Sequence, residues 1–357
     1  MAYTTIDKAS EHFNTVLYTG NNSSPRTITG VGFQPDMNWS KIRSESNDHW
    51  VSDVVRGSNK IIRPNGTNDE LVNGSSGYLS SFNSDGYVIA AGSGTNENFN
   101  KSSGTMASWN WKAGGAVSNN NNDDGQGYST VSANTTAGFS IVTYTGTGSN
   151  TNFGHGLGAA PKMILVKNLS DTDNWVVYHE SLGNTDGLYL NTTDSTVGTN
   201  TFWNNSTPTA TVFYVGTHNR VNGSGDNMIA YCFAEKTGYS KFGSYNGNNN
   251  SDGTFVYTGF KPAFLMLKDS QSGQYWHMFD NKREPFNDND FAQLAPNAAG
   301  SEATIRTDRG IANLDFLSNG FKFNTDNSGF NGTNKYIYMC FAAAPLVGSN
   351  NVTAKAR

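Results

Sequence analysis

The sequence contains few charged residues, and this scarcity excludes several classes of protein. Asp, Glu, Lys and Arg make up 15% of its 357 residues, whereas an average soluble domain has about 25%. The 24 basic and 29 acidic side chains give a net charge of −5, and no basic stripe of the kind that binds phosphates is present. We therefore expect no nucleic-acid partner.

Long apolar runs are also missing. The best of them, residues 337–347, is broken by Pro345 and falls short of the ~18 residues that a membrane-spanning helix needs. Residues 1–8 have no apolar core of the type found in signal peptides. We expect no membrane insertion, and we expect synthesis in a cytoplasm without export by the standard secretory route.

Cysteine and proline are scarce as well. The two cysteines, Cys232 and Cys340, each lie in an apolar aromatic run, which favours two buried free thiols; a disulfide between them is the alternative. The 9 prolines and the irregular spacing of glycine exclude collagen. Good helix formers are few, which disfavours a coiled coil or a helical bundle.

Gly, Asn, Ser and Thr fill the sequence instead, together with many aromatic residues. The chain has 39 Gly, and 12% of its residues are Phe, Trp or Tyr, which is more burial potential than a disordered chain carries. Short alternating stretches separated by Gly- and Asn-rich turns are typical of all-β sandwiches or barrels. We predict an all-β fold with little helix, the one helix candidate being residues 5–12.

Several landmarks recur three times in the same order. A Tyr-x-Gly motif begins at Tyr18, Tyr144 and Tyr245, with separations of 126 and 101 residues. Three further landmarks repeat with these separations to within one residue: Pro35, Pro161 and Pro262; Lys41, Lys167 and Lys268; and Trp50, Trp175 and Trp276. An aromatic strand closes each set, at residues 109–111, 231–233 and 339–341. The pattern indicates an internal triplication.

Each repeat has the length of one β-sandwich domain. We predict three tandem sandwich domains of jelly-roll or lectin type, at residues 1–115, 128–237 and 238–347, the first with a short N-terminal helix or arm. An Asn/Gly-rich linker is expected at 116–127 and a C-terminal tail at 348–357. Because most aromatic residues fall on the landmark strands, we expect three separate cores.

No motif in the sequence predicts chemistry. Nucleophile elbows, phosphate-binding loops and helix-borne metal spacings are absent. A glycosidase needs two facing carboxylates, and no such pair recurs across the repeats; a pair in one repeat alone is the alternative. We expect no catalytic site, no metal and no cofactor. The repeated Trp and Pro residues are interpreted as structural. Trp203, beside Asn204 and Asn205, is the best candidate for stacking against a glycan.

Motifs along nearly the whole chain resemble a known family. They include Tyr18-Thr-Gly20, Gly32-Phe-Gln-Pro35, Asp53-Val-Val-Arg-Gly57, Trp175-Val-Val-Tyr-His179, Gly238-Tyr-Ser-Lys-Phe-Gly243 and Phe279-Asp-Asn-Lys-Arg283. This set is similar to a repeat domain of virion proteins from tailed phages of marine bacteria, such as those of cyanobacteria. The resemblance implies a tail-fibre or other virion structural protein, and it supplies no catalytic residue.

These observations together predict a non-enzymatic virion protein, most simply a tail-fibre or adhesin component that presents sandwich loops to the host surface. The expected partners are other virion proteins, further copies of the chain, with a trimer as one form, and a host surface glycan or protein. The expected location is the virion, assembled in the host cytoplasm and acting outside it. A capsid or tail decoration protein is the alternative, and a polysaccharide-degrading tailspike-type enzyme a weaker one.

Overall fold

The computed structural model describes residues 4–93, 97–115, 118–121, 128–287 and 289–347. Nearly all of its regular structure is antiparallel β-sheet, as predicted. The described helices are short: η1 (Ala9–Glu11), α1 (Glu97–Asn100), α2 (Asn200–Trp203), α3 (Asn219–Asn222) and α4 (Glu302–Arg309).

The first unit of the fold, residues 13–111, is built from two main sheets. Its four-stranded sheet has the order β1 (Phe13–Thr19), β9 (Thr105–Trp111), β3 (Met37–Ile42) and β4 (Trp50–Asp53). The smaller sheet has the order β2 (Arg26–Thr29), β8 (Gly86–Ala90) and β7 (Tyr78–Asn83). The short strands β5 (Lys60–Ile61) and β6 (Leu71–Val72) pair beside them.

The second unit, residues 118–121 and 128–233, contains an eight-stranded sheet. Its order is β10 (Ser118–Asn121), β11 (Tyr128–Asn134), β12 (Phe139–Thr145), β19 (Asn227–Phe233), β14 (Met163–Asn168), β15 (Val176–His179), β16 (Asp186–Tyr189) and β17 (Val197–Gly198). A second layer pairs β13 (Thr151–Gly154) with β18 (Val212–Val215).

The third unit, residues 240–345, again has a four-stranded and a three-stranded sheet. The first has the order β20 (Ser240–Asn246), β26 (Lys335–Pro345), β22 (Phe260–Asp269) and β23 (Trp276–Asp280). The second has the order β21 (Phe255–Tyr257), β25 (Gly320–Phe323) and β24 (Leu314–Leu317).

One strand order occurs in all three units. The strand that leads into Tyr-x-Gly pairs with the closing strand. The closing strand pairs with an apolar strand that carries the repeated lysine, and this apolar strand pairs with a strand that begins at or directly after the repeated Trp. The three series are β1-β9-β3-β4, β12-β19-β14-β15 and β20-β26-β22-β23. The apolar strands are buried along both faces in β3 and β14, as expected of strands covered on each side. The closing strands expected at residues 109–111, 231–233 and 339–341 are confirmed.

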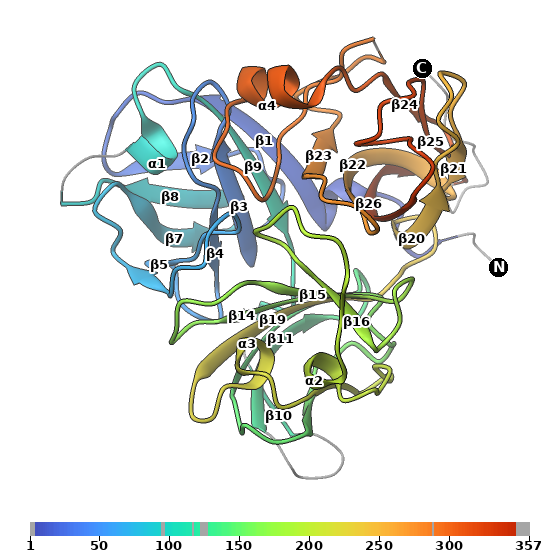
Figure 1. Cartoon of the computed structure of the whole chain (residues 1–357). Helices are drawn as coiled ribbons and strands as arrows, with labels where there is room; N and C mark the ends of the chain where they lie inside the picture. Colours follow the sequence, from blue (N-terminus) through green and yellow to red (C-terminus); the bar gives the residue numbers. More distant parts are fainter. Residues whose placement is uncertain (1–3, 94–96, 116–117, 122–127, 288, 348–357) are drawn as a thin grey trace.

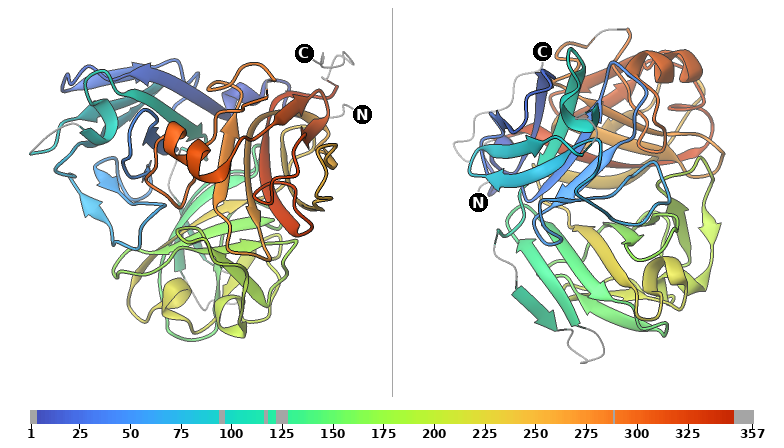
Figure 2. Two further views of the ribbon diagram at one scale, coloured as in Figure 1. Left: turned by 45° about the horizontal axis from the view of Figure 1, so that its top comes forward. Right: turned by 90° about the vertical axis from the view of Figure 1, so that its left-hand side faces the viewer.

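The three units surround a common centre (Figures 1 and 2). At that centre Trp111, Phe233 and Phe341, which hold equivalent positions on the closing strands, form a triangle. Its ring centroids lie 6.5 Å (Trp111 to Phe233), 5.9 Å (Trp111 to Phe341) and 6.1 Å (Phe233 to Phe341) apart. One core cluster therefore holds residues of all three units. The expectation of three separate cores is wrong, because these aromatic rings of the closing strands pack between the units. The first and second units also keep smaller clusters of their own. The boundaries of independently folding domains stay a prediction.

Three smaller expectations have different outcomes. The helix expected over residues 5–12 is a single 3-10 turn, η1. The expected linker at 116–127 lies partly outside the described residues, and its segment 118–121 is strand β10, which pairs with β11. The expected tail, 348–357, lies outside them entirely. Among the described residues, no helix combines the length and hydrophobicity required to cross a membrane.

Candidate functional site

The Tyr-x-Gly motif anchors a loop in each unit. The hydroxyls of Tyr18, Tyr144 and Tyr245 donate to the carbonyls of Phe99, Val221 and Phe330, at 2.7, 2.6 and 2.6 Å. The next residue in each loop is a buried Asn whose side-chain oxygen accepts a backbone N–H from the strand end: Asn100, Asn222 and Asn331. A Cβ on the motif glycine, Gly20, Gly146 or Gly247, would overlap a backbone carbonyl of the same loop. The motif is structural in all three units.

The repeated lysines are buried inside turns. The Nζ of Lys41, Lys167 and Lys268 donates to the carbonyl four residues later, at 3.0, 3.2 and 3.1 Å. Burial lowers the pKa of Lys41 to about 7 and that of Lys167 and Lys268 to about 8, against the opposing effect of nearby carboxylates. Each ammonium group thus holds together the turn that follows its strand.

The turn after each lysine receives a loop from another unit. The carbonyl two residues beyond the lysine accepts a backbone N–H across the unit boundary, in the pairs Glu70 to Leu169 (3.2 Å), Thr196 to Ser270 (3.0 Å) and Glu302 to Arg43 (3.0 Å). The first unit therefore contacts the second, the second the third, and the third the first. These three bonds close the units into a ring.

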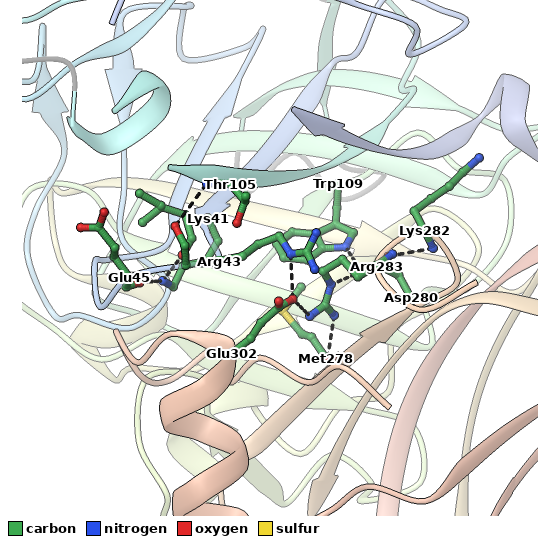
Figure 3. Close-up of polar contacts among 12 residues, drawn as sticks. Lys41, Arg43, Glu45, Thr105, Trp109, Met278, Asp280, Lys282, Arg283 and Glu302 are labelled. Carbon is green, nitrogen blue, oxygen red and sulfur yellow. Dashed lines mark hydrogen bonds and ion pairs between the residues drawn. The ribbon is translucent and has the colours of Figure 1, made fainter. Parts of the chain in front are cut away.

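Two of the three boundaries also contain a buried ionic triad. Arg56 contacts Asp53 at 2.5 Å and Glu70 at 3.4 Å. Arg283 contacts Asp280 at 2.5 Å and Glu302 at 2.9 Å, and Arg43 binds the same Glu302 oxygen (Figure 3). Burial opposes the charge of Arg56, yet Asp53 and its other neighbours raise the pKa of this guanidinium. These ion pairs hold the three side chains of each triad together at a unit boundary.

The second unit replaces this triad with His179, Leu182 and Thr196 at the equivalent positions. Bonds near the centre still cross each boundary: Tyr231 Oη to Asp53 Oδ2 (2.7 Å), Trp109 Nε1 to Asp280 Oδ2 (3.0 Å), and His179 Nε2 to the Tyr338 carbonyl (3.1 Å). No sequence pattern predicted that these groups meet. The available signal was spacing, since Asp53 and Asp280 are 227 residues apart, as are Pro35 and Pro262.

A groove of about 760 Å³ lies at the boundary between the first and second units; we call it the Tyr128 groove. Its floor is the face of β11, β12 and β19 that carries Tyr128, Thr143 and Asn227, and its wall is the segment with Lys60 and Glu70. The Tyr128 side chain is 73% exposed. Lys60 and Glu70 form an ion pair at 2.9 Å.

A second pocket, of about 470 Å³, lies at the boundary between the third and first units, beside α4. Three carboxylates line it, those of Glu284, Asp290 and Glu302. Arg43 binds Glu302, and Arg306 forms an ion pair with Asp290. This pocket is lined by several charged side chains, whereas the floor of the Tyr128 groove carries hydroxyl and amide groups.

The predicted glycan residues do not form an exposed platform. Trp203 ends the short helix α2, is 1% exposed and donates its indole N–H to the Asp186 carbonyl at 3.0 Å. The expectation that its ring stacks on a sugar is wrong, because the ring is inside the core of the second unit. Asn204 and Asn205, which follow it in left-handed conformation, lie apart from the two pockets.

The structural landmarks occupy buried positions. Trp50, Trp175 and Trp276 are 5%, 1% and 1% exposed, and Pro35, Pro161 and Pro262 are also buried. The indoles of Trp175 and Trp276 donate across unit boundaries, to the carbonyls of Arg63 and Tyr189. Cys232 and Cys340 are buried free thiols, as the apolar runs predicted. Within the described part of the chain, no cluster of three or more His, Cys, Asp or Glu side chains has the arrangement of a metal site.

The fold and the boundaries define an all-β protein of three similar units closed into a ring. Residues 8–345 match the family described as a domain of unknown function (DUF7483). This match spans most of the chain, so the protein belongs to that family. Neither the curated proteins nor the solved structures include a match to the chain.

Proposed function

We propose that the protein is a non-enzymatic structural component of a tailed-phage virion, acting as a tail-fibre or adhesin component that presents its surface to the host. One observation carries this proposal: the landmarks shared by the units are used in structure. Tyr-x-Gly anchors a loop, the lysine holds a turn, and the Trp residues are buried in the core. A scaffold of this kind leaves the segments between landmarks to vary and to bind.

The motifs quoted above, with their resemblance to phage virion proteins, support the same assignment. The low proportion of charged residues and the many Asn, Gly and Thr residues of the sequence suit a protein assembled in the cytoplasm that works outside the cell. Binding would be to other virion proteins and to a host glycan or protein, with several copies acting together. A decoration protein of the capsid or tail uses the same features and differs only in location.

Virion composition and cell binding test the proposal. We expect mass spectrometry of purified virions to detect the protein, gold-labelled antibodies to mark the tail tip, and fluorescently labelled protein to bind host cells. Label on the capsid or tail tube without cell binding would favour the decoration protein. Absence of the protein from purified virions would refute both versions.

The pocket beside α4 favours one second candidate, a polysaccharide-degrading activity. Its three carboxylates, Glu284, Asp290 and Glu302, provide the residue type that a glycosidase needs. Two arginines already bind Glu302, so Glu284 and Asp290 are the carboxylates to test. Incubation with host polysaccharide and an assay of reducing ends decides between the candidates. Release by the wild type that is lost in both Glu284→Gln and Asp290→Asn would establish the enzyme.

A further inference from the structure

We propose that the Tyr128 groove binds a neutral oligosaccharide, with Tyr128 as the stacking platform and threonine and asparagine side chains as hydrogen-bonding partners. This inference rests on the proposed adhesin function and assigns its binding site. The groove volume of about 760 Å³ falls within the range of small-molecule sites.

The floor of the groove carries polar side chains on three adjacent strands. Thr143 pairs with Thr130 of β11, and Thr145 pairs with Asn227 of β19. Residues opposite one another on antiparallel strands share a face, so the three threonines and the asparagine point to one side of the sheet. Hydroxyl and amide groups both donate and accept hydrogen bonds, as sugar hydroxyls do.

Tyr128 stands at the rim of this floor. Its side chain is 73% exposed, whereas the tyrosines of the Tyr-x-Gly motif at Tyr144 and Tyr245 are buried. A tyrosine ring offers an apolar face and a polar tip, which fits the apolar face of a pyranose and its hydroxylated edge. The ring is therefore placed to stack on one sugar while the floor binds the next.

The charges at the groove favour a neutral ligand. Lys60 is paired with Glu70 at 2.9 Å, and Arg56 is paired with Asp53 inside the wall, with side chains at most 1% exposed. The wall thus offers balanced charges that can bond to hydroxyls, without the excess of cations that an acidic glycan requires.

The edge of the floor argues against an extended peptide as the occupant. Strand β10 pairs with β11 from Ser118 opposite Val131 to Asn121 opposite Tyr128. A peptide that binds by strand addition needs an open edge, and the edge strand on this side of the sheet is β10, whereas the groove lies over the face of β11, β12 and β19. The remaining surface is a face of side chains, which suits a sugar.

Saturation-transfer NMR with three trisaccharides, maltotriose, cellotriose and triacetylchitotriose, tests the proposal on the full chain. We expect at least one to receive saturation from the wild type, with affinity reduced about tenfold in Tyr128→Ala. Thr143→Val, which keeps shape and strand preference, should also weaken binding. The control Tyr257→Ala removes another exposed tyrosine, 53% exposed on β21, and should bind like the wild type.

Each outcome decides a different question. Lack of binding by all three trisaccharides, or binding unchanged in Tyr128→Ala and Thr143→Val, overturns the groove assignment. Stronger binding of anionic sialyllactose than of every neutral trisaccharide overturns the assignment of a neutral ligand. If Tyr128→Ala attaches to host cells as well as the wild type does, the groove is not the site of host binding, and the adhesin function is not affected. If the protein binds sugar at Tyr128 but is absent from virions, the adhesin function is refuted, and the assignment of the groove as a sugar site is kept.

Discussion

The hydroxyl of Tyr231 donates a hydrogen bond of 2.7 Å to Asp53 Oδ2, although the two residues belong to different units and are 178 positions apart. Asp53 simultaneously contacts Arg56 at 2.5 Å, and the two side chains are almost fully buried. The buried carboxylate is thus satisfied by groups from two units, so the stability of one unit depends on the other.

Tyr231→Phe should therefore destabilise the whole chain. The substitution keeps the ring in the core and removes one hydrogen bond to a buried carboxylate, which costs about 2 kcal/mol. Urea denaturation followed by tryptophan fluorescence measures the loss. As the control, Tyr128→Phe removes a hydroxyl at an exposed side chain and should leave the unfolding midpoint unchanged. Equal midpoints for wild type and Tyr231→Phe would contradict the prediction.

The second unit shows which residues can replace an ionic triad, because it has His179, Leu182 and Thr196 at the equivalent positions. Arg283→Leu places at the third unit the residue type found at Leu182, but leaves Asp280 buried without its guanidinium. Removal of one partner of a buried pair costs about 3–5 kcal/mol. The triple variant Asp280→His, Arg283→Leu and Glu302→Thr copies the second unit, so it should be more stable than Arg283→Leu alone. A triple variant that is less stable than the single one would show that the two boundaries are not interchangeable.

Two buried histidines should make the protein acid-labile. Burial lowers the pKa of His155 and of His179 to about 4, against opposing backbone carbonyls of Thr209 and Tyr338. Each neutral ring also accepts a backbone N–H at Nδ1, from Leu157 or Ser181. Between pH 6.5 and about 4 the unfolded chain binds more protons, so stability falls as pH falls through this range, by about 3 kcal/mol per histidine.

Urea midpoints measured from pH 7 to pH 4 check the acid effect. His155→Asn and His179→Asn supply an amide oxygen in place of the Nδ1 acceptor and do not titrate. The double variant should lose stability less steeply on acidification than the wild type. If the two proteins show the same pH dependence, the histidines are not the cause.

The motif glycines should tolerate no side chain. A Cβ at Gly146 would overlap the carbonyl of Gly223, and relief requires the loop to move away from its tyrosine anchor. Gly146→Ala should cost about 3 kcal/mol. Gly273→Ala is the matched control, because the nearest atom to its Cβ would be the Thr193 carbonyl oxygen at 3.9 Å. Thermal unfolding that is equally unaffected in both variants would refute this account of the motif.

Local sequence patterns predicted the strands and the buried thiols because both depend on residues close in the chain. The closing strands show the limit of that information. Trp111, Phe233 and Phe341 give the same alternation whether their rings fill a core within one unit or meet at a common centre. The choice depends on how three surfaces fit, which local periodicity does not encode, so the shared core was missed.

The candidate site shows the same limit. Trp203 lies in a stretch rich in Thr and Asn that suggests a loop, but the Thr199 side chain caps a helical turn and the ring packs inward. Tyr128 begins a strand, and its position becomes informative only when the first unit supplies the opposite wall with Lys60 and Glu70. A groove shared by two units has no contiguous sequence signature.

Closure of the ring also sets the order in which the protein can be completed during synthesis. Arg43 and Glu302, which meet at the last boundary, are separated by 259 positions. At about 5–20 residues per second, a ribosome needs roughly 10 to 50 seconds to translate from one to the other. Throughout that interval the nascent first unit exposes the apolar surface that the third unit later covers, so a chaperone that shields this surface would meet the chain before its C-terminal third exists.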